Sequence, residues 1–246
     1  MIPIGDDNSD RVRAPLVNWL LIAANLFVFI ALQGLGANQR FTMAYATVPA
    51  EILTGRDIAA PIPIRDAYGR TVEELNLEPT PIPVYLTLLT AMFMHGGIAH
   101  IAGNMLYLWI FGDNLEDAMG HGRYLVFYLL TGTVASISHV LVTALSGANP
   151  LIPSLGASGA ISGVLGGYIL LFPHRRVRVL FLYQIMQVPA IVAIGLWFLF
   201  QLVSGAGMIG GDTGGVAYGA HIGGFIAGLL LVRLFDTRPR AILPGA

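Results

Sequence analysis

Cysteine and lysine are both absent from this 246-residue chain, and charged residues of any kind are scarce. Without cysteine there are no disulfides, no thiolate metal ligands and no cysteine nucleophile. Because all 13 basic residues are arginine, Schiff-base chemistry and a serine–lysine dyad are excluded as well. Charged residues make up only 11% of the chain, against about 25% in soluble domains, and 55% of the chain is hydrophobic. This composition indicates a polytopic membrane protein in contact with the lipid bilayer. The net charge of −1 and the lack of a basic patch give no sign of a nucleic-acid partner.

Six apolar segments approach the roughly 20 residues that a membrane-spanning helix needs. They are Leu16–Leu35, Ile98–Leu115, Tyr124–Leu145, Ser158–Phe172, Gln187–Val203 and Tyr218–Phe235. We therefore predict an all-α membrane protein, a six-transmembrane-helix bundle over residues 15–236 with cytoplasmic tails at 1–14 and 237–246. The fourth segment is short for a span, so we expect it to begin below the membrane surface, after a loop that dips inward.

The connection between the first two segments, at about 36–97, is much longer than the others. Loops of this length are usually functional or disordered. Its last part, Val84–Met94, is apolar but only about eleven residues long, so it is too short to cross a bilayer. We predict an interfacial helix there and a first loop that is partly embedded in the membrane.

Arginine placement predicts the orientation, because basic residues concentrate on the cytoplasmic side. Nine arginines would lie on one side of the six spans: Arg11, Arg13, Arg123, Arg175, Arg176, Arg178, Arg233, Arg238 and Arg240. The other four lie in the long first loop. Both termini are therefore predicted to be cytoplasmic, in what the composition suggests is a prokaryotic plasma membrane. The ends of the spans that carry Ser158 and His221 would then face outward together.

Ser158 and His221 are nucleophile-type and base-type residues placed at membrane depth, where polar groups are costly and point to function. Glycines recur at four-residue intervals beside them, at Gly159, Gly163 and Gly167 and at Gly224 and Gly228. Small residues at this spacing allow two membrane helices to come into close contact. If these faces meet, the imidazole could take the serine proton as a general base.

Each of these residues also has a structural interpretation. A single membrane serine more often bonds to its own backbone, and the glycines could serve packing alone. His95, His100 and His221 could bind a metal, but no carboxylate or thiol lies close enough in sequence to complete a ligand set, so neither metal nor cofactor is predicted. A third triad member is missing from the spans: Asp212 is on the correct side but in a glycine-rich loop. A Ser–His dyad is the simplest interpretation.

His100 and Asn104 are one helical turn apart in the second segment and so share a face. Both can donate a hydrogen bond, which suits the negative oxygen of a tetrahedral intermediate. The alternative is that they bond to each other or to the loop and hold the helix in register.

Taken together, three motifs resemble the rhomboid family of intramembrane serine proteases. They are His100-x-x-x-Asn104, Gly156-x-Ser158-Gly159 and Ala220-His221-x-x-Gly224, and the resemblance extends from about Met92 to Leu231. It implies Ser158 as the nucleophile and His221 as the general base and acid. It also implies an oxyanion hole of His100, Asn104 and the Ser158 backbone N–H, with His95, Gly156, Gly159 and Gly224 in support.

Two positions depart from the pattern that this resemblance implies. Some rhomboids carry an aromatic residue four positions after the nucleophile, where this chain has Ser162. Some also have a Trp-Arg pair in the first loop, whereas the first loop of this chain lacks tryptophan.

The function that the resemblance implies is cleavage of transmembrane protein substrates. The competing hypothesis is a non-catalytic rhomboid-like protein that binds client helices.

Overall fold

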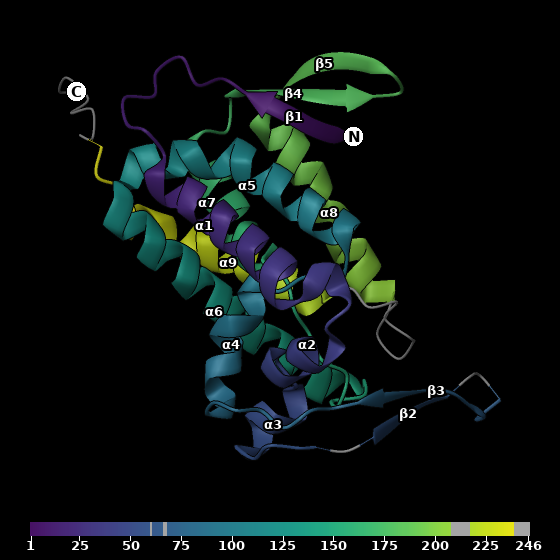
Figure 1. Ribbon diagram of the computed structural model, residues 1–246. Helices are drawn as coiled ribbons and strands as arrows, with labels where there is room; N and C mark the ends of the chain where they lie inside the picture. The colour runs from purple at the N-terminus through teal and green to yellow at the C-terminus, as the bar shows by residue number, and fades with distance from the viewer. Residues whose placement is uncertain (60, 66–67, 208–216, 239–246) are drawn as a thin grey trace.

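The computed structural model describes residues 1–59, 61–65, 68–207 and 217–238, and most of these are helical, as predicted (Figure 1). Each of the six apolar segments overlaps one α-helix. These are α1 (Leu16–Phe27, continued by a π-helical turn to Leu32), α5 (Ile98–Met119), α6 (His121–Ser146), α7 (Ser158–Leu171), α8 (Ala190–Gly207) and α9 (Tyr218–Phe235).

Length and apolar composition differ among these helices. Within the described residues, α6 and α9 are each long and apolar enough to cross a membrane. The short helical stretch Val84–Phe93 and α5 also qualify as a pair, although they meet at a bend of 80°. The helices at Leu16–Leu32, Ser158–Leu171 and Ala190–Gly205 are apolar but shorter.

Helix α7 lies in the middle of the bundle, packed against α5, α6 and α9. All of its residues from Gly159 to Tyr168 are buried, which is the environment expected for a helix that is apolar on every side. At 1.5 Å per residue its 14 residues span roughly 21 Å, against roughly 39 Å for the 26 residues of α6. Helix α7 is therefore much shorter than α6, and its first residue, Ser158, is only partly exposed.

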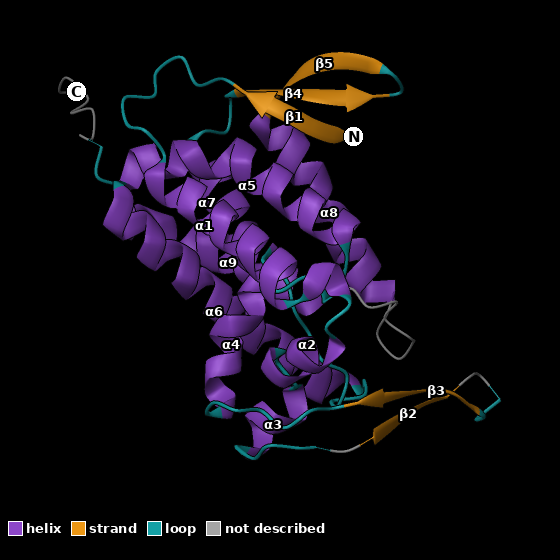
Figure 2. Ribbon diagram, in the orientation of Figure 1, coloured by secondary structure: helices purple, strands orange, loops and turns teal. Residues whose placement is uncertain are grey.

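Two small β-sheets, which the sequence patterns did not predict, lie at opposite ends of the helices (Figure 2). One is antiparallel with the order β1-β4-β5, and the other is a hairpin of β2 and β3 within the first loop. The strands are β1 (Ile2–Asp6), β2 (Pro61–Arg65), β3 (Thr71–Asn76), β4 (Arg176–Phe181) and β5 (Gln184–Pro189). Because β5 runs through Pro189, helix α8 begins at Ala190 and not at Gln187 as predicted.

The N-terminal segment, predicted as a tail, is docked onto the ends of the helices. The carboxylate of Asp6 accepts hydrogen bonds from the hydroxyl of Tyr168 on α7 (2.6 Å) and the amide of Asn114 on α5 (2.8 Å). Arg175 donates to the side chain of Asn114 and pairs with Asp10 at 2.5 Å. This network fastens β1 across the end of the bundle opposite Ser158.

Docking of β1 should depend on pH through Asp6. Burial raises the pKa of Asp6 to about 7, helped by the Asp113 carboxylate and opposed by hydrogen bonds and by Arg175. Because the folded-state pKa lies above the unfolded value, the folded state gains from protonated Asp6 at low pH and loses this stabilisation as the pH rises through about 7. Thermal unfolding between about pH 5 and pH 8 should therefore show a fall in stability that Asp6→Asn reduces. The exposed neighbour Asp7 provides the control, since Asp7→Asn should keep the wild-type slope. Equal slopes in all three proteins would contradict this assignment.

The first loop supports the segment that precedes α7. It contains α2 (Gln39–Tyr45), α3 (Pro49–Thr54) and α4 (Thr87–Thr90), the last flanked by 3-10 turns at Val84–Leu86 and Ala91–Phe93. Thr47 and Ser154 exchange two backbone hydrogen bonds of 3.0 and 2.8 Å, and the N–H of Gly156 donates to the carbonyl of Ala91 at 2.9 Å. Loop residues far away in sequence thus hold the chain just before Ser158.

Candidate active site

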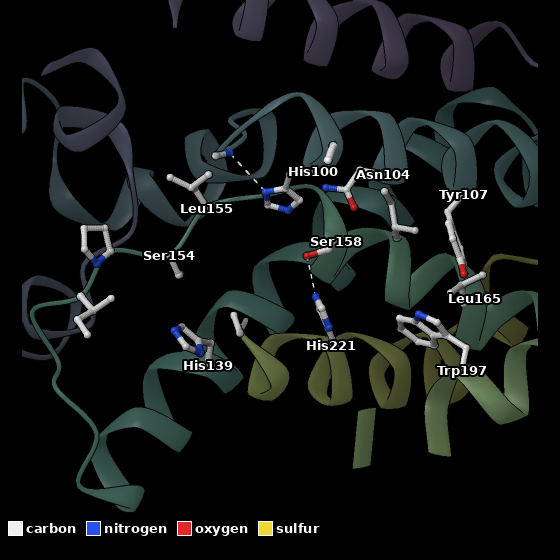
Figure 3. A pocket seen from close by; sticks show the side chains of 17 residues that line it. His100, Asn104, Tyr107, His139, Ser154, Leu155, Ser158, Leu165, Trp197 and His221 are labelled. Carbon is white, nitrogen blue, oxygen red and sulfur yellow. Dashed lines mark hydrogen bonds between the residues drawn. The ribbon is translucent and has the colours of Figure 1, made fainter. Parts of the chain in front are cut away.

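Ser158 and His221 are in hydrogen-bond contact. Ser158 is the first residue of α7, and His221 lies in the first turn of α9. The Ser158 Oγ is 2.8 Å from the His221 Nε2, so the hydroxyl can donate directly to the imidazole (Figure 3). Two residues that are 63 positions apart in sequence thus meet at hydrogen-bond distance, the geometry in which an imidazole can act as a base toward a hydroxyl.

Glycines bring the two helices this close. A Cβ built at Gly224 would lie 2.2 Å from the carbonyl oxygen of Gly159, and one at Gly228 would lie 2.0 Å from the carbonyl oxygen of Gly163. No side chain fits at such distances, so α7 and α9 meet backbone to backbone. His221 precedes Gly224 by about one turn and therefore lies opposite the start of α7.

Two features of the structure require a glycine at position 156, two residues before Ser158. The Gly156 φ of 134° lies in a region that side-chain-bearing residues rarely adopt. A Cβ there would also lie 3.0 Å from the Nε2 of His100 and 3.6 Å from the Oγ of Ser158. The missing side chain leaves a space bordered by the serine hydroxyl and the His100 ring.

His100 and Asn104 on α5 border the same space (Figure 3). The Nδ1 of His100 accepts a hydrogen bond from the N–H of Gly96 at 3.3 Å, which leaves Nε2 as the protonated nitrogen that can donate. The Nδ2 of Asn104 is buried and has no hydrogen-bond partner among the described residues. The Ser158 N–H belongs to the first turn of α7, whose N–H groups have no acceptor within the helix. Hydrogen-bond donors placed in this way beside a serine hydroxyl could stabilise a negatively charged oxygen.

His95 lies directly behind His100. Its ring is buried and packs edge-on against the His100 ring, with centroids 5.1 Å apart and an interplanar angle of 73°. The side chain of Gln33 accepts from the His95 N–H at 2.9 Å and donates to the His95 carbonyl at 3.0 Å. Gln33 thus fixes the backbone of His95, and the His95 ring in turn contacts the His100 ring.

Helix α8 contributes two residues, Gln201 and Trp197, that lie beside His221 and that the sequence motifs did not place there. The Oε1 of Gln201 is 2.8 Å from the Nδ1 of His221, and the ring of Trp197 lies 6.0 Å from the imidazole, centroid to centroid. Ser162, which replaces the expected aromatic residue, is buried one turn below Ser158 and donates to its carbonyl at 2.6 Å. A polar amide inside an apolar helix was the available signal for Gln201, since such residues are functional by default.

One cavity of about 520 Å³ is lined by Ser158, His221, His100, Asn104 and Trp197. His139 and Ser154 add polar groups to its wall (Figure 3). No group of three metal-ligating side chains occurs in the described part of the chain. Asp212, the acidic residue considered on this side, lies outside the described residues.

Apolar helices that surround a half-buried serine, a half-buried histidine and a buried asparagine define an integral membrane protein with a polar site inside its bundle. The family model described as the Rhomboid domain matches residues 83–237, more than half of the 246 residues, and the chain belongs to the rhomboid family. The match includes all of the residues placed around the cavity above.

Three relatives show how far the similarity extends. The rhomboid protease GluP of Bacillus subtilis is 38% identical over 153 residues, which cover 61% of this chain and 28% of that protein. Rhomboid protein 1, mitochondrial, of Saccharomyces cerevisiae is 34% identical over 147 residues, covering 59% and 40%. The human presenilin-associated rhomboid-like protein, mitochondrial, is 28% identical over 155 residues, covering 59% and 36%. The match thus spans well under half of each relative.

Proposed function

We propose that this protein is an intramembrane serine endopeptidase that cleaves transmembrane or juxtamembrane segments of membrane proteins. The observation that carries the proposal is the contact of 2.8 Å between the Ser158 Oγ and the His221 Nε2. Beside it lies the Asn104 Nδ2, which has no hydrogen-bond partner in the described part of the chain. Membership of the rhomboid family and the similarity to a rhomboid protease support the proposal.

The first half of the reaction forms an acyl-enzyme. The Ser158 Oγ attacks the scissile carbonyl carbon while the His221 Nε2 takes the hydroxyl proton. The oxygen that becomes negative is stabilised by the His100 Nε2–H, the Asn104 amide and the Ser158 N–H. When the tetrahedral intermediate collapses, the C–N bond breaks and His221 returns the proton to the leaving amine.

The second half of the reaction releases the new carboxyl terminus. Water from the cavity attacks the ester carbonyl while His221 takes one of its protons, and the same donors stabilise the second oxyanion. His221 then protonates the Ser158 oxygen as the ester bond breaks. Both halves use the same two residues and require no cofactor.

The chemistry restricts the substrate. A helical peptide bond is shielded by its own side chains and hydrogen bonds, so the segment must unwind locally before Ser158 can reach it. Substrates with glycine, proline or other weak helix formers near the cut are therefore favoured.

The arginine distribution supports cytoplasmic termini and a site that opens to the outer side of a prokaryotic plasma membrane.

A fluorophosphonate probe, which reacts covalently with an activated serine, tests the proposal on purified protein. We expect labelling of the wild type, none of Ser158→Ala, and cleavage of a reconstituted transmembrane peptide by the wild type alone. Ser154→Ala, which removes another cavity hydroxyl, identifies the labelled residue, because labelling should persist in it. A folded wild-type protein that is neither labelled nor active would support the non-catalytic binding role instead.

A further inference from the structure

The second ring nitrogen of His221 is also held. Its Nδ1 lies 2.8 Å from the Oε1 of Gln201, and the Gln201 side chain is buried within the bundle. A buried amide in a membrane helix is costly unless it is hydrogen-bonded. This contact gives Gln201 a partner and connects α8 to the nucleophile through the imidazole.

The chain of hydrogen bonds has a direction. To take a proton from Ser158, the Nε2 of His221 must be unprotonated, so the neutral ring carries its hydrogen on Nδ1. An Nδ1–H needs an acceptor, and the carbonyl oxygen of Gln201 is placed to be one. The opposite tautomer would put a hydrogen on Nε2 and make His221 unable to accept from the serine.

We propose that Gln201 is a positioning residue that fixes the tautomer and ring orientation of His221 for proton transfer with Ser158. This inference rests on the proposed peptidase function. Trp197, one turn earlier on α8, places its ring against the same imidazole. One face of α8 thus supplies both the hydrogen bond and the ring contact that orient the base.

The charged and titratable groups around His221 determine which effect of the Gln201 amide can be measured. Among the residues that the structure describes, the titratable groups that face the imidazole are His100 on α5, His139 on α6 and Tyr218 on its own helix. The described residues that line the cavity include no carboxylate and no arginine. A neutral amide can therefore orient the ring but cannot stabilise its positive form as a carboxylate would.

Gln201→Leu and Gln201→Glu separate these two effects. Leucine removes the acceptor and should lower kcat up to about tenfold with KM nearly unchanged, a change of about 1.4 kcal/mol at most, because one neutral hydrogen bond is lost. In Gln201→Glu, a negative carboxylate beside Nδ1 would favour the imidazolium form of His221 over its neutral form. The acid limb of the pH–rate profile should therefore move to higher pH by about one unit or more. Gln187→Glu makes the same substitution on the exposed strand β5 and should leave the profile in place.

The outcomes distinguish this inference from the proposed function. If Ser158→Ala still reacts with the fluorophosphonate, the peptidase function itself fails. If Ser158→Ala is inert but Gln201→Leu keeps wild-type kcat and Gln201→Glu keeps the wild-type pH profile, only the role of Gln201 is wrong. Should the leucine variant not fold, the glutamate profile alone decides, because loss of structure lowers the rate without moving the acid limb.

Discussion

His221→Ala is expected to lower the rate of peptide hydrolysis by roughly 10⁴–10⁶-fold, and adding Ser158→Ala should cost almost nothing more. The physical reason is that the two side chains share one proton transfer. Without the imidazole, the hydroxyl has no base at 2.8 Å, and without the hydroxyl the imidazole has nothing to activate. Single-turnover cleavage of a reconstituted transmembrane peptide measures all three variants against wild type.

His174→Ala is the control for histidine removal as such. His174 is exposed between α7 and β4 and lies outside the cavity, so this variant should cleave at the wild-type rate. If the losses of the two single variants instead multiply in the double variant, Ser158 and His221 act independently and the shared proton transfer is wrong.

Spacing along single helices was the most predictable part of the site. His100 and Asn104 are one turn apart, so a helix alone places both on one face, and the structure has both at the cavity. Glycine spacing likewise predicted that α7 and α9 could meet, and Gly224 and Gly228 do lie against the carbonyls of Gly159 and Gly163. Local geometry decides these features, so the sequence pattern is sufficient for them.

Features that depend on contacts between segments far apart in sequence could not be predicted from spacing along one helix. Strand β1 is short and contains Pro3, and it forms only because β4 and a polar network with Asp6 receive it. Gln201 was not predicted because the usual partner of a general-base histidine is a carboxylate and not an amide. Its role depends on which face of α8 turns toward α9, and tertiary packing decides that.

Replacing a glycine in the α7–α9 contact should inactivate the protein without touching a reacting atom. In Gly228→Ala, the new Cβ would lie 2.0 Å from the carbonyl oxygen of Gly163, so the two helices must separate by roughly an ångström or more. Because Ser158 and His221 sit on these two helices, their contact lengthens, and a displacement of this size costs about 10²-fold in rate. Rates of peptide cleavage and of fluorophosphonate labelling should fall together, and the unfolding temperature should fall as well.

Gly195→Ala provides the matched control, since a Cβ at that position on α8 meets nothing within 4 Å among the described residues. It should keep both activity and stability, because alanine also favours the helix more than glycine does. A Gly228→Ala protein that retains activity within a few-fold would mean that the helices can shift without separating the two residues. The Ser158–His221 contact would then be determined by the first loop, which holds Ser154 and Gly156, and by Gln201 on α8, rather than by the packing of α7 against α9.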